Sequence, residues 1–201
     1  SKQRESFQSS MDIIFGFVGK DFALVSCSSS VQPSIVALTQ TEDKILEVSP
    51  TKIIGCSGEN GDRKQLGDYL LGNFNLYKFR HERETDMDAT AHSFRNSVAY
   101  FLRRQPYQVN MVFGGVDGDV PSIYFIDYLG TLQKMNYASH GYGSYILLSL
   151  FDRLWKKDMT KEEALELCRK CQDEIMNRFP MNEHHYVTKI VSKDGIEVTK
   201  C

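Results

Sequence analysis

The spacing of apolar residues changes repeatedly along the chain, and the order of these patterns restricts the possible folds more than any other feature of the sequence. Apolar residues alternate with a period of two over the first sixty residues, then recur at helical spacing through two stretches that end at Pro106. Alternation returns over residues 107–138, and a second pair of helical stretches follows. The chain then closes on a hairpin pattern, so the predicted order is strands, two helices, strands, two helices, strands.

Short turns between neighbouring strands indicate that most of them pair as hairpins. Gly19-Lys20-Asp21 separates the first two strands, and Lys193-Asp194-Gly195 separates the last two. Hairpins give largely antiparallel sheets, and two amphipathic helix pairs need two sheet faces to cover. The predicted fold class is therefore α+β, a four-layer αββα sandwich with two mainly antiparallel sheets between helix pairs. The expected strands cover residues 11–18, 22–29, 44–49, 52–58, 107–115, 122–130 and 131–138, with a final hairpin over 185–200.

Local signals predict where the helices begin and end. Asn60 or Asp62 is expected to cap the first helix, and the charged run 78–86 is expected to end it. Asp88 opens the second helix, and Pro106 closes it because the residue before a proline is pushed out of the helical region. The third helix is expected over 142–155. The fourth begins at a Thr-Lys-Glu-Glu capping box (residues 160–163) and ends before Pro180.

Length and composition place the chain among ordinary globular proteins. Its 201 residues fit one domain, expected over 11–201, and the polar residues 1–10 are expected to form a short extension. A net charge of −2 gives no electrostatic basis for nucleic-acid binding, and no apolar run approaches the ~18 residues of a membrane span. Five cysteines without a secretory signal favour a reducing compartment, the cytoplasm or the nucleus.

The Cys168 and Cys171 pair has the Cys-x-x-Cys spacing of zinc and redox motifs. Zinc needs two further ligands at matching spacing, and none lies near in the sequence. Redox pairs usually start a helix after a strand, whereas this pair falls within a predicted helix. Because Ala164 and Ile175 share its helical face, we predict that both cysteines pack in the core.

Three other polar motifs are weaker candidates. His184-His185 has only Glu183 beside it, so no metal site is predicted there. Asp117-Gly118-Asp119 lacks the remaining ligands of a calcium loop and is typical of a hairpin turn. The segment 141–144 (Gly-Tyr-Gly-Ser) starts a helix and could accept an anion, but no phosphate-loop lysine follows. The residues alone therefore predict no cofactor, no metal and no active site.

Six stretches resemble, in order along the chain, the β-type subunits of the 20S proteasome. They are SPTKIIGCSGENGD, RRQPYQVNMVFGGVDGD, YFIDYLGTL, HGYGS, DMTKEEALELC and KIVSKDGIE, and the resemblance covers nearly all of the chain from Met11 onward. That family has the N-terminal-nucleophile hydrolase fold, which agrees with the αββα sandwich. Within the family, the start MDIIFGFV is most similar to the non-catalytic β4 type.

The resemblance also implies a catalytic arrangement against which this chain can be compared. Active members use an N-terminal threonine, whose hydroxyl attacks the peptide carbonyl while its own α-amine acts as general base. A lysine lowers the pKa of that amine, and an aspartate orients the lysine. A serine and an aspartate late in the chain support the amine, and the threonine is exposed by cleavage after a glycine.

Most of these positions are changed in this chain. The nucleophile position is Met11, whose thioether cannot act as a hydroxyl nucleophile, and Ser10 stands where cleavage would need glycine. The lysine is kept as Lys44, but the aspartate of the second strand falls at Cys27. Lys44 is therefore expected to lack partners.

The late positions of the family pattern are changed as well. The serine falls at Tyr142, and the aspartate falls at Phe179, just after Arg178. Residues 182–185 (Asn-Glu-His-His) replace the family's Ser-Gly-Gly. The resemblance therefore implies a non-catalytic subunit.

The same resemblance implies the partners of such a subunit. It would neighbour other β subunits in a heteroheptameric ring, stacked between an α ring and the opposite β ring, in the cytoplasm and nucleus. A small-molecule cleft at the boundary with an active neighbour is a further hypothesis, with Val31 and Gln32 as candidate residues.

Two other interpretations of the sequence are less favoured. In an active peptidase, Ser1 would be the nucleophile, but it lies ten residues before the first strand, and such catalysis depends on orientation. Ser9 and Ser10 do not head the chain. A free-standing binding or scaffold protein is disfavoured because a monomer would struggle to bury 12 Phe, 10 Tyr and 1 Trp.

Overall fold

The computed structural model describes residues 12–30, 41–179 and 185–199. Within these ranges the chain forms ten strands and four helices. In chain order they are β1 (Ile14–Val18), β2 (Phe22–Ser28), β3 (Ile45–Ser49), β4 (Lys52–Gly58), α2 (Asn60–His81), α3 (Met87–Leu102), β5 (Val109–Asp117), β6 (Val120–Ile126), β7 (Leu132–Met135), β8 (Tyr137–His140), α4 (Ser144–Leu154), α5 (Lys161–Arg178), β9 (Tyr186–Ser192) and β10 (Gly195–Thr199).

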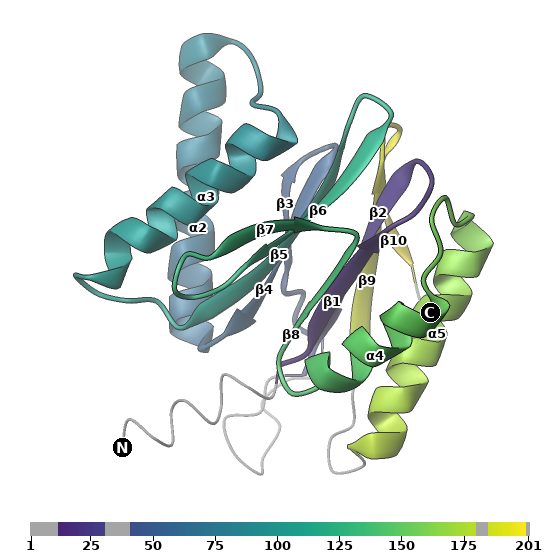
Figure 1. Ribbon diagram of the computed structural model, residues 1–201. Helices are drawn as coiled ribbons and strands as arrows, with labels where there is room; N and C mark the ends of the chain where they lie inside the picture. The colour runs from purple at the N-terminus through teal and green to yellow at the C-terminus, as the bar shows by residue number, and fades with distance from the viewer. Residues whose placement is uncertain (1–11, 31–40, 180–184, 200–201) are drawn as a thin grey trace, which may run out of the picture.

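The strands form two stacked sheets, and each sheet carries a helix pair on its outer face (Figure 1). The first sheet has the order β10-β9-β2-β1-β8, and the second has the order β3-β4-β5-β6-β7. Every neighbouring pair is antiparallel. Helices α4 and α5 pack on the first sheet, and α2 and α3 pack on the second. The predicted αββα sandwich is therefore confirmed.

Alternating strand residues supply three separate apolar layers. On β1, Ile14 belongs to the layer between the two sheets, while Phe15 belongs to the layer beneath α4 and α5. Both side chains are fully buried, because an inner strand of a sandwich is covered on both faces. The third layer lies between α2, α3 and the second sheet, and Phe94 and Phe113 meet there edge to face.

The stretch 131–138, predicted as one strand, is in fact two strands that belong to different sheets. β7 pairs with β6 in the second sheet, and β8 pairs with β1 in the first. The chain crosses between the sheets at Asn136, whose carbonyl accepts a hydrogen bond from the Val18 N–H at 2.9 Å. The prediction was wrong here because the alternation of side chains continues through the crossing without a proline or glycine to mark it.

The first helix begins and ends at other residues than predicted. Glu59 caps α2 and accepts a hydrogen bond from the Asp62 N–H at 2.8 Å, whereas Asn60 and Asp62 lie inside the first turn. The helix also continues into the charged run as far as His81. It ends where Glu82 adopts a left-handed conformation with a φ of 52°. Charged residues did not stop the helix, because they remain solvated on its surface.

The ends of the later helices include two wrong predictions, both on α3, and one that is confirmed. Asp86 caps α3 through a hydrogen bond from the Ala89 N–H at 2.7 Å, so Asp88 is not the capping residue. Pro106 does not set the end of α3, which stops at Leu102. The capping box of α5 is confirmed: the side chains of Thr160 and Glu163 bond reciprocally to each other's backbone N–H.

Candidate functional site

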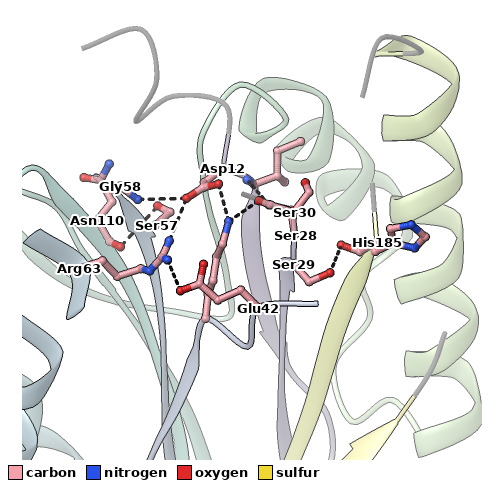
Figure 2. Close-up of polar contacts among 12 residues, drawn as sticks. Asp12, Ser28, Ser29, Ser30, Glu42, Ser57, Gly58, Arg63, Asn110 and His185 are labelled. Atoms are coloured by element: carbon pink, nitrogen blue, oxygen red, sulfur yellow. Dashed lines mark hydrogen bonds and ion pairs between the residues drawn. The ribbon is translucent and has the colours of Figure 1, made fainter. Parts of the chain in front are cut away.

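The start of β1 is the place where the sequence predicted a lost nucleophile. Met11 itself lies outside the described residues, and Asp12 is the first residue that the structure describes. Asp12 lies at one end of the sandwich, where four parts of the chain come together (Figure 2). These parts are the start of β1, the segment after β2, the segment before β3, and the junction of β4 with α2.

Asp12 accepts hydrogen bonds from three groups. Its Oδ1 lies 2.6 Å from Lys44 Nζ, and its Oδ2 lies 3.3 Å from Arg63 Nη1. The backbone N–H of Gly58 points at the same Oδ2 from 3.5 Å. One carboxylate therefore joins β1 to two cationic side chains that come from different elements (Figure 2).

The buried Lys44 has partners, so the expectation that it lacks them is wrong. Its Nζ bonds to Asp12 and also donates to the Ser30 carbonyl at 2.8 Å, and its side chain is only 1% exposed. Arg63 completes the cluster by donating from Nη2 to Glu42 Oε1 at 2.7 Å. Two cations thus face two carboxylates, as burial of charge requires.

Cys27 provides neither a counter-charge nor a nucleophile. It lies on β2 opposite Ile14 and is fully buried in the layer between the sheets. Burial raises the pKa of the Cys27 thiol well above its ordinary value, and the nearby Lys44 ammonium lowers that pKa by less than burial raises it. The group is therefore a neutral thiol at neutral pH, and the thiol is the unreactive form of cysteine.

The serine hydroxyls near this cluster bond to backbone groups. Ser28 Oγ accepts from the Ile13 N–H at 3.2 Å, and Ser29 Oγ donates to the His185 carbonyl at 3.0 Å. Ser57 Oγ donates to the carbonyl of Asn110, which lies opposite it on β5, at 3.5 Å (Figure 2). These bonds fix the ends of strands, and they do not pair a hydroxyl with a base that would activate it.

The glycine-rich segment before α4 lies beside the start of β1. A side chain on Gly141 would place its Cβ 2.1 Å from the Asp12 carbonyl, and this glycine has a φ of +89°. Only glycine fits here. Tyr142 is 39% exposed, and Phe179 ends α5 and packs against the apolar layer beneath it. Neither side chain can supply the serine or aspartate chemistry of an active relative.

The other predicted motifs have structural roles where the structure describes them. Cys168 and Cys171 are buried in the layer between α5 and the first sheet, as predicted. Asp117 ends β5, and the Gly118-Asp119 turn leads into β6, which confirms the hairpin. His185 is described, but His184 and the candidates Ser1, Ser9, Ser10, Val31 and Gln32 lie outside the described residues.

Metal ligation and membrane insertion find no support in the described part of the chain. Over residues 12–30, 41–179 and 185–199, no three His, Cys, Asp or Glu side chains gather closely enough to hold a metal ion. In the same ranges, none of the helices combines the length and apolarity that crossing a bilayer would need.

Three residues of this cluster were missed by the sequence analysis. Asp12, Glu42 and Arg63 are separated by tens of positions, and no short motif connects them. One signal was available: Asp12 is a charged residue placed directly before a strand that is apolar on both faces. A charge at such a place needs a partner when it is buried.

Comparison with known proteins gives a consistent result over most of the chain. A family model described as "Proteasome subunit" matches residues 12–191. The chain is 41% identical over 186 residues to "Proteasome subunit beta type-2" of Oryza sativa subsp. japonica, which covers 92% of this chain and 88% of the relative. It is 38% identical over 189 residues to "Proteasome subunit beta type-4" of Saccharomyces cerevisiae, with 92% and 96% covered. The Dictyostelium discoideum "Proteasome subunit beta type-2" is 39% identical over 192 residues, with 94% and 96% covered.

Proposed function

Because this chain belongs to the proteasome subunit family, we propose that it is a non-catalytic β subunit of the 20S core particle. Its relatives of the beta type-2 and type-4 groups match it over nearly their whole length, which supports a place in the same position of the ring. In this role the subunit completes the β ring and helps to enclose the chamber in which other subunits degrade proteins.

One observation carries the non-catalytic part of the proposal. Lys44, the single kept member of the catalytic pattern, is already bonded to Asp12 and to the Ser30 carbonyl. The residue before Asp12 is a methionine, which has no hydroxyl for that lysine to influence. The charged cluster therefore holds strands together and has no acyl-transfer chemistry to perform.

The proposed partners follow from family membership. The subunit would contact two neighbouring β subunits, the α ring on one side and the β ring of the opposite half, in the cytoplasm and nucleus. Each contact around the ring is heterologous, because different surfaces of neighbouring subunits meet there. Large side chains are exposed on the isolated chain, among them Phe79 at 81% on α2 and Tyr145 at 82% on α4, and contacts with neighbouring subunits would cover such residues.

The competing function, an active N-terminal-nucleophile peptidase, is disfavoured by the residues at the start of β1. A working site would need a hydroxyl placed within hydrogen-bond reach of a free amine. The hydroxyls of Ser28, Ser29 and Ser57 instead form hydrogen bonds with backbone groups.

Covalent labelling of assembled particles tests the proposal. Core particles that contain a tagged copy of this chain are treated with a threonine-reactive inhibitor, and the mass of every subunit is measured. We expect adducts on active subunits in the same particles, which serve as the internal control, and an unchanged mass for this chain. An adduct on this chain would overturn the non-catalytic assignment.

Sedimentation of the tagged chain tests the assembly role. A ring subunit is expected in particles on the order of 700 kDa, as the family resemblance implies, whereas a free-standing protein would sediment near 23.0 kDa. Depletion of the chain should also lower the amount of assembled core particle. A tagged chain found only as a monomer in cells would contradict the proposal.

A further inference from the structure

We propose that Lys44, Arg63 and the backbone N–H of Gly58 form an anion-binding site that Asp12 fills as a tethered ligand. The site would accept a free small carboxylate when the Asp12 carboxylate is removed. It is built from this chain's own residues, so it does not depend on assembly into a ring.

The donors converge on one carboxylate from different directions. Lys44 bonds to Oδ1 at 2.6 Å, while Arg63 and the Gly58 N–H approach Oδ2 at 3.3 and 3.5 Å. Figure 2 shows Gly58 and Arg63 on the same side of the Asp12 carboxylate. Both oxygens are therefore engaged, which is the arrangement expected for a bound carboxylate.

The site lies where β4 ends and α2 begins. Gly58 is the last residue of β4, and α2 begins two residues later at Asn60. Arg63 lies in the first turns of that helix. Glu59 caps the helix N-terminus, so the site draws its positive charge from the two cationic side chains and adds one backbone N–H from the strand end.

Burial makes an empty site costly. The side chains of Lys44 and Arg63 are 1% and 6% exposed, so neither cation can turn fully to water if its partner is lost. Among the described residues, Lys44 would keep only the Ser30 carbonyl, which is a neutral acceptor. Glu42 bonds to Arg63 Nη2 and would still neutralise that cation, whereas Lys44 would lose its carboxylate partner.

The expected ligand is a small monocarboxylate. Asp12→Ala keeps the Cβ and removes a group of the size and charge of formate, so formate is the probe that matches the vacated space. Lys44 and Arg63 contact different oxygens of the carboxylate, and a spherical anion such as chloride cannot make both contacts as a carboxylate does.

The experiment compares the thermal unfolding of the full chain in sodium formate and in sodium chloride of equal ionic strength. For Asp12→Ala we expect about 0.1 M formate to raise the midpoint by about 3–5 °C over chloride, because a ligand bound only by the folded state stabilises it. In the wild type the tethered carboxylate occupies the site, so we expect no difference between the two salts.

Two variants separate a built site from a general salt effect. Asp12→Ala combined with Arg63→Met removes one arm of the site and should abolish the response to formate. Asp43→Ala removes a carboxylate from a different buried lysine, Lys189, which keeps Glu47, and it should not respond either. The same midpoint shift in all variants, or none in Asp12→Ala, would overturn the proposal.

The proposal can also be tested if Asp12→Ala is too unstable to be purified in its folded form. Asp12→Ala can be refolded from urea in formate or in chloride, and the soluble yield replaces the midpoint as the measured quantity. A several-fold higher yield in formate, lost in the variant that also carries Arg63→Met, supports the site. Equal yields in the two salts contradict it.

Discussion

Two buried lysines hold the same segment of the chain, and they are neutralised in different ways. Lys44 lies just before β3 and bonds to Asp12 and the Ser30 carbonyl. Lys189 lies on β9 and reaches across to that segment, where it bonds to Asp43, Glu47 and the Ile45 carbonyl at 2.7, 2.8 and 3.0 Å. Each lysine joins the first sheet to the edge of the second.

The difference lies in the number of carboxylates that each cation can use. Asp12 is shared by two buried cations, Lys44 and Arg63, and its own side chain is mostly buried. Lys189 bonds to two carboxylates, those of Asp43 and Glu47, and both side chains are about half exposed. Removal of one carboxylate should therefore be severe at the first lysine and mild at the second, because only the first loss leaves a buried charge uncompensated.

The largest expected effect is that of Asp12→Ala. Breaking a buried ion pair from one side usually costs about 3–5 kcal/mol, and we expect a loss of free energy of unfolding in this range. Urea denaturation of the variant and of the wild type measures it, and Asp43→Ala is the matched control. A loss below about 1 kcal/mol in Asp12→Ala would show that Glu42 or water replaces the carboxylate.

His140 extends the comparison to a buried group that stays neutral. It ends β8, stacks on Phe125 at 4.1 Å, and its Nε2 lies 3.1 Å from the Met111 carbonyl. Burial lowers the pKa of His140 from 6.5 to about 4, although the Met111 carbonyl and the nearby Asp127 act in the opposite direction.

The sign of the resulting pH dependence follows from this shift. The unfolded chain binds the proton more tightly, so stability from this group is present above the unfolded pKa of 6.5 and is lost as the pH falls toward about 4. Between about pH 7 and about pH 5 this group should remove about 2 kcal/mol of stability. Denaturation at both pH values should show a smaller loss in His140→Gln, and an unchanged loss would exclude His140 as a cause.

A smaller effect is expected from Lys189→Met. Methionine fills the buried space of the lysine stem and leaves two half-exposed carboxylates that water can solvate, so we expect a cost of about 1 kcal/mol near neutral pH. Burial lowers the pKa of Lys189, but its bonds to Asp43 and Glu47 outweigh burial and raise the pKa above 10.5. Stability from this lysine is therefore present below pH 10.5 and lost as the pH rises through the folded pKa.

Alkaline denaturation checks that sign. The wild type should lose stability above pH 10.5, and Lys189→Met should lose less over the same range. If the wild type and Lys189→Met lost the same stability over this pH range, a group other than Lys189 would cause the alkaline loss.

The smallest effects are expected from Asp43→Asn and Glu47→Gln. Each single change should cost less than about 1 kcal/mol, because the other carboxylate still neutralises Lys189. The double variant should cost more than the sum of the two, since it leaves the buried cation with only the Ile45 carbonyl. Additive losses in a double-mutant cycle would mean that the two carboxylates do not substitute for each other.

The sequence predicted most of the fold because periodicity reports local burial. Every predicted helix is present, each predicted strand except 131–138 corresponds to one strand, and the capping box at Thr160 is placed correctly. The crossing at Asn136 was missed because one alternating pattern serves two sheets. The cap at Glu59 was missed because Asn60 and Asp62 carry stronger capping preferences, and only geometry decides among neighbours.

The charged cluster was less predictable than the fold. Lys44 could be placed by resemblance, but its partner could not, because the changed residue at Cys27 suggested that no counter-ion remained. Asp12 supplies the counter-ion from the neighbouring strand, and Arg63 joins it from a helix 51 positions away. Such contacts depend on how distant elements pack, and no local pattern of residues encodes that packing.

The topology of the two sheets has a consequence for folding during synthesis. Strands β3 to β7 of the second sheet follow one another in the chain, so this sheet can pair as it is made. The first sheet is different, because β2 pairs with β9, and Ser26 meets Thr188, 162 positions later. The ribosome therefore makes the β1–β2 hairpin first, but β2 gains its second partner strand only when β9 has been made. Pairing between strands so far apart in the chain is slow. Until β9 emerges from the ribosome, the β2 edge of this hairpin remains unpaired, which makes the incomplete chain a substrate for chaperones or for aggregation.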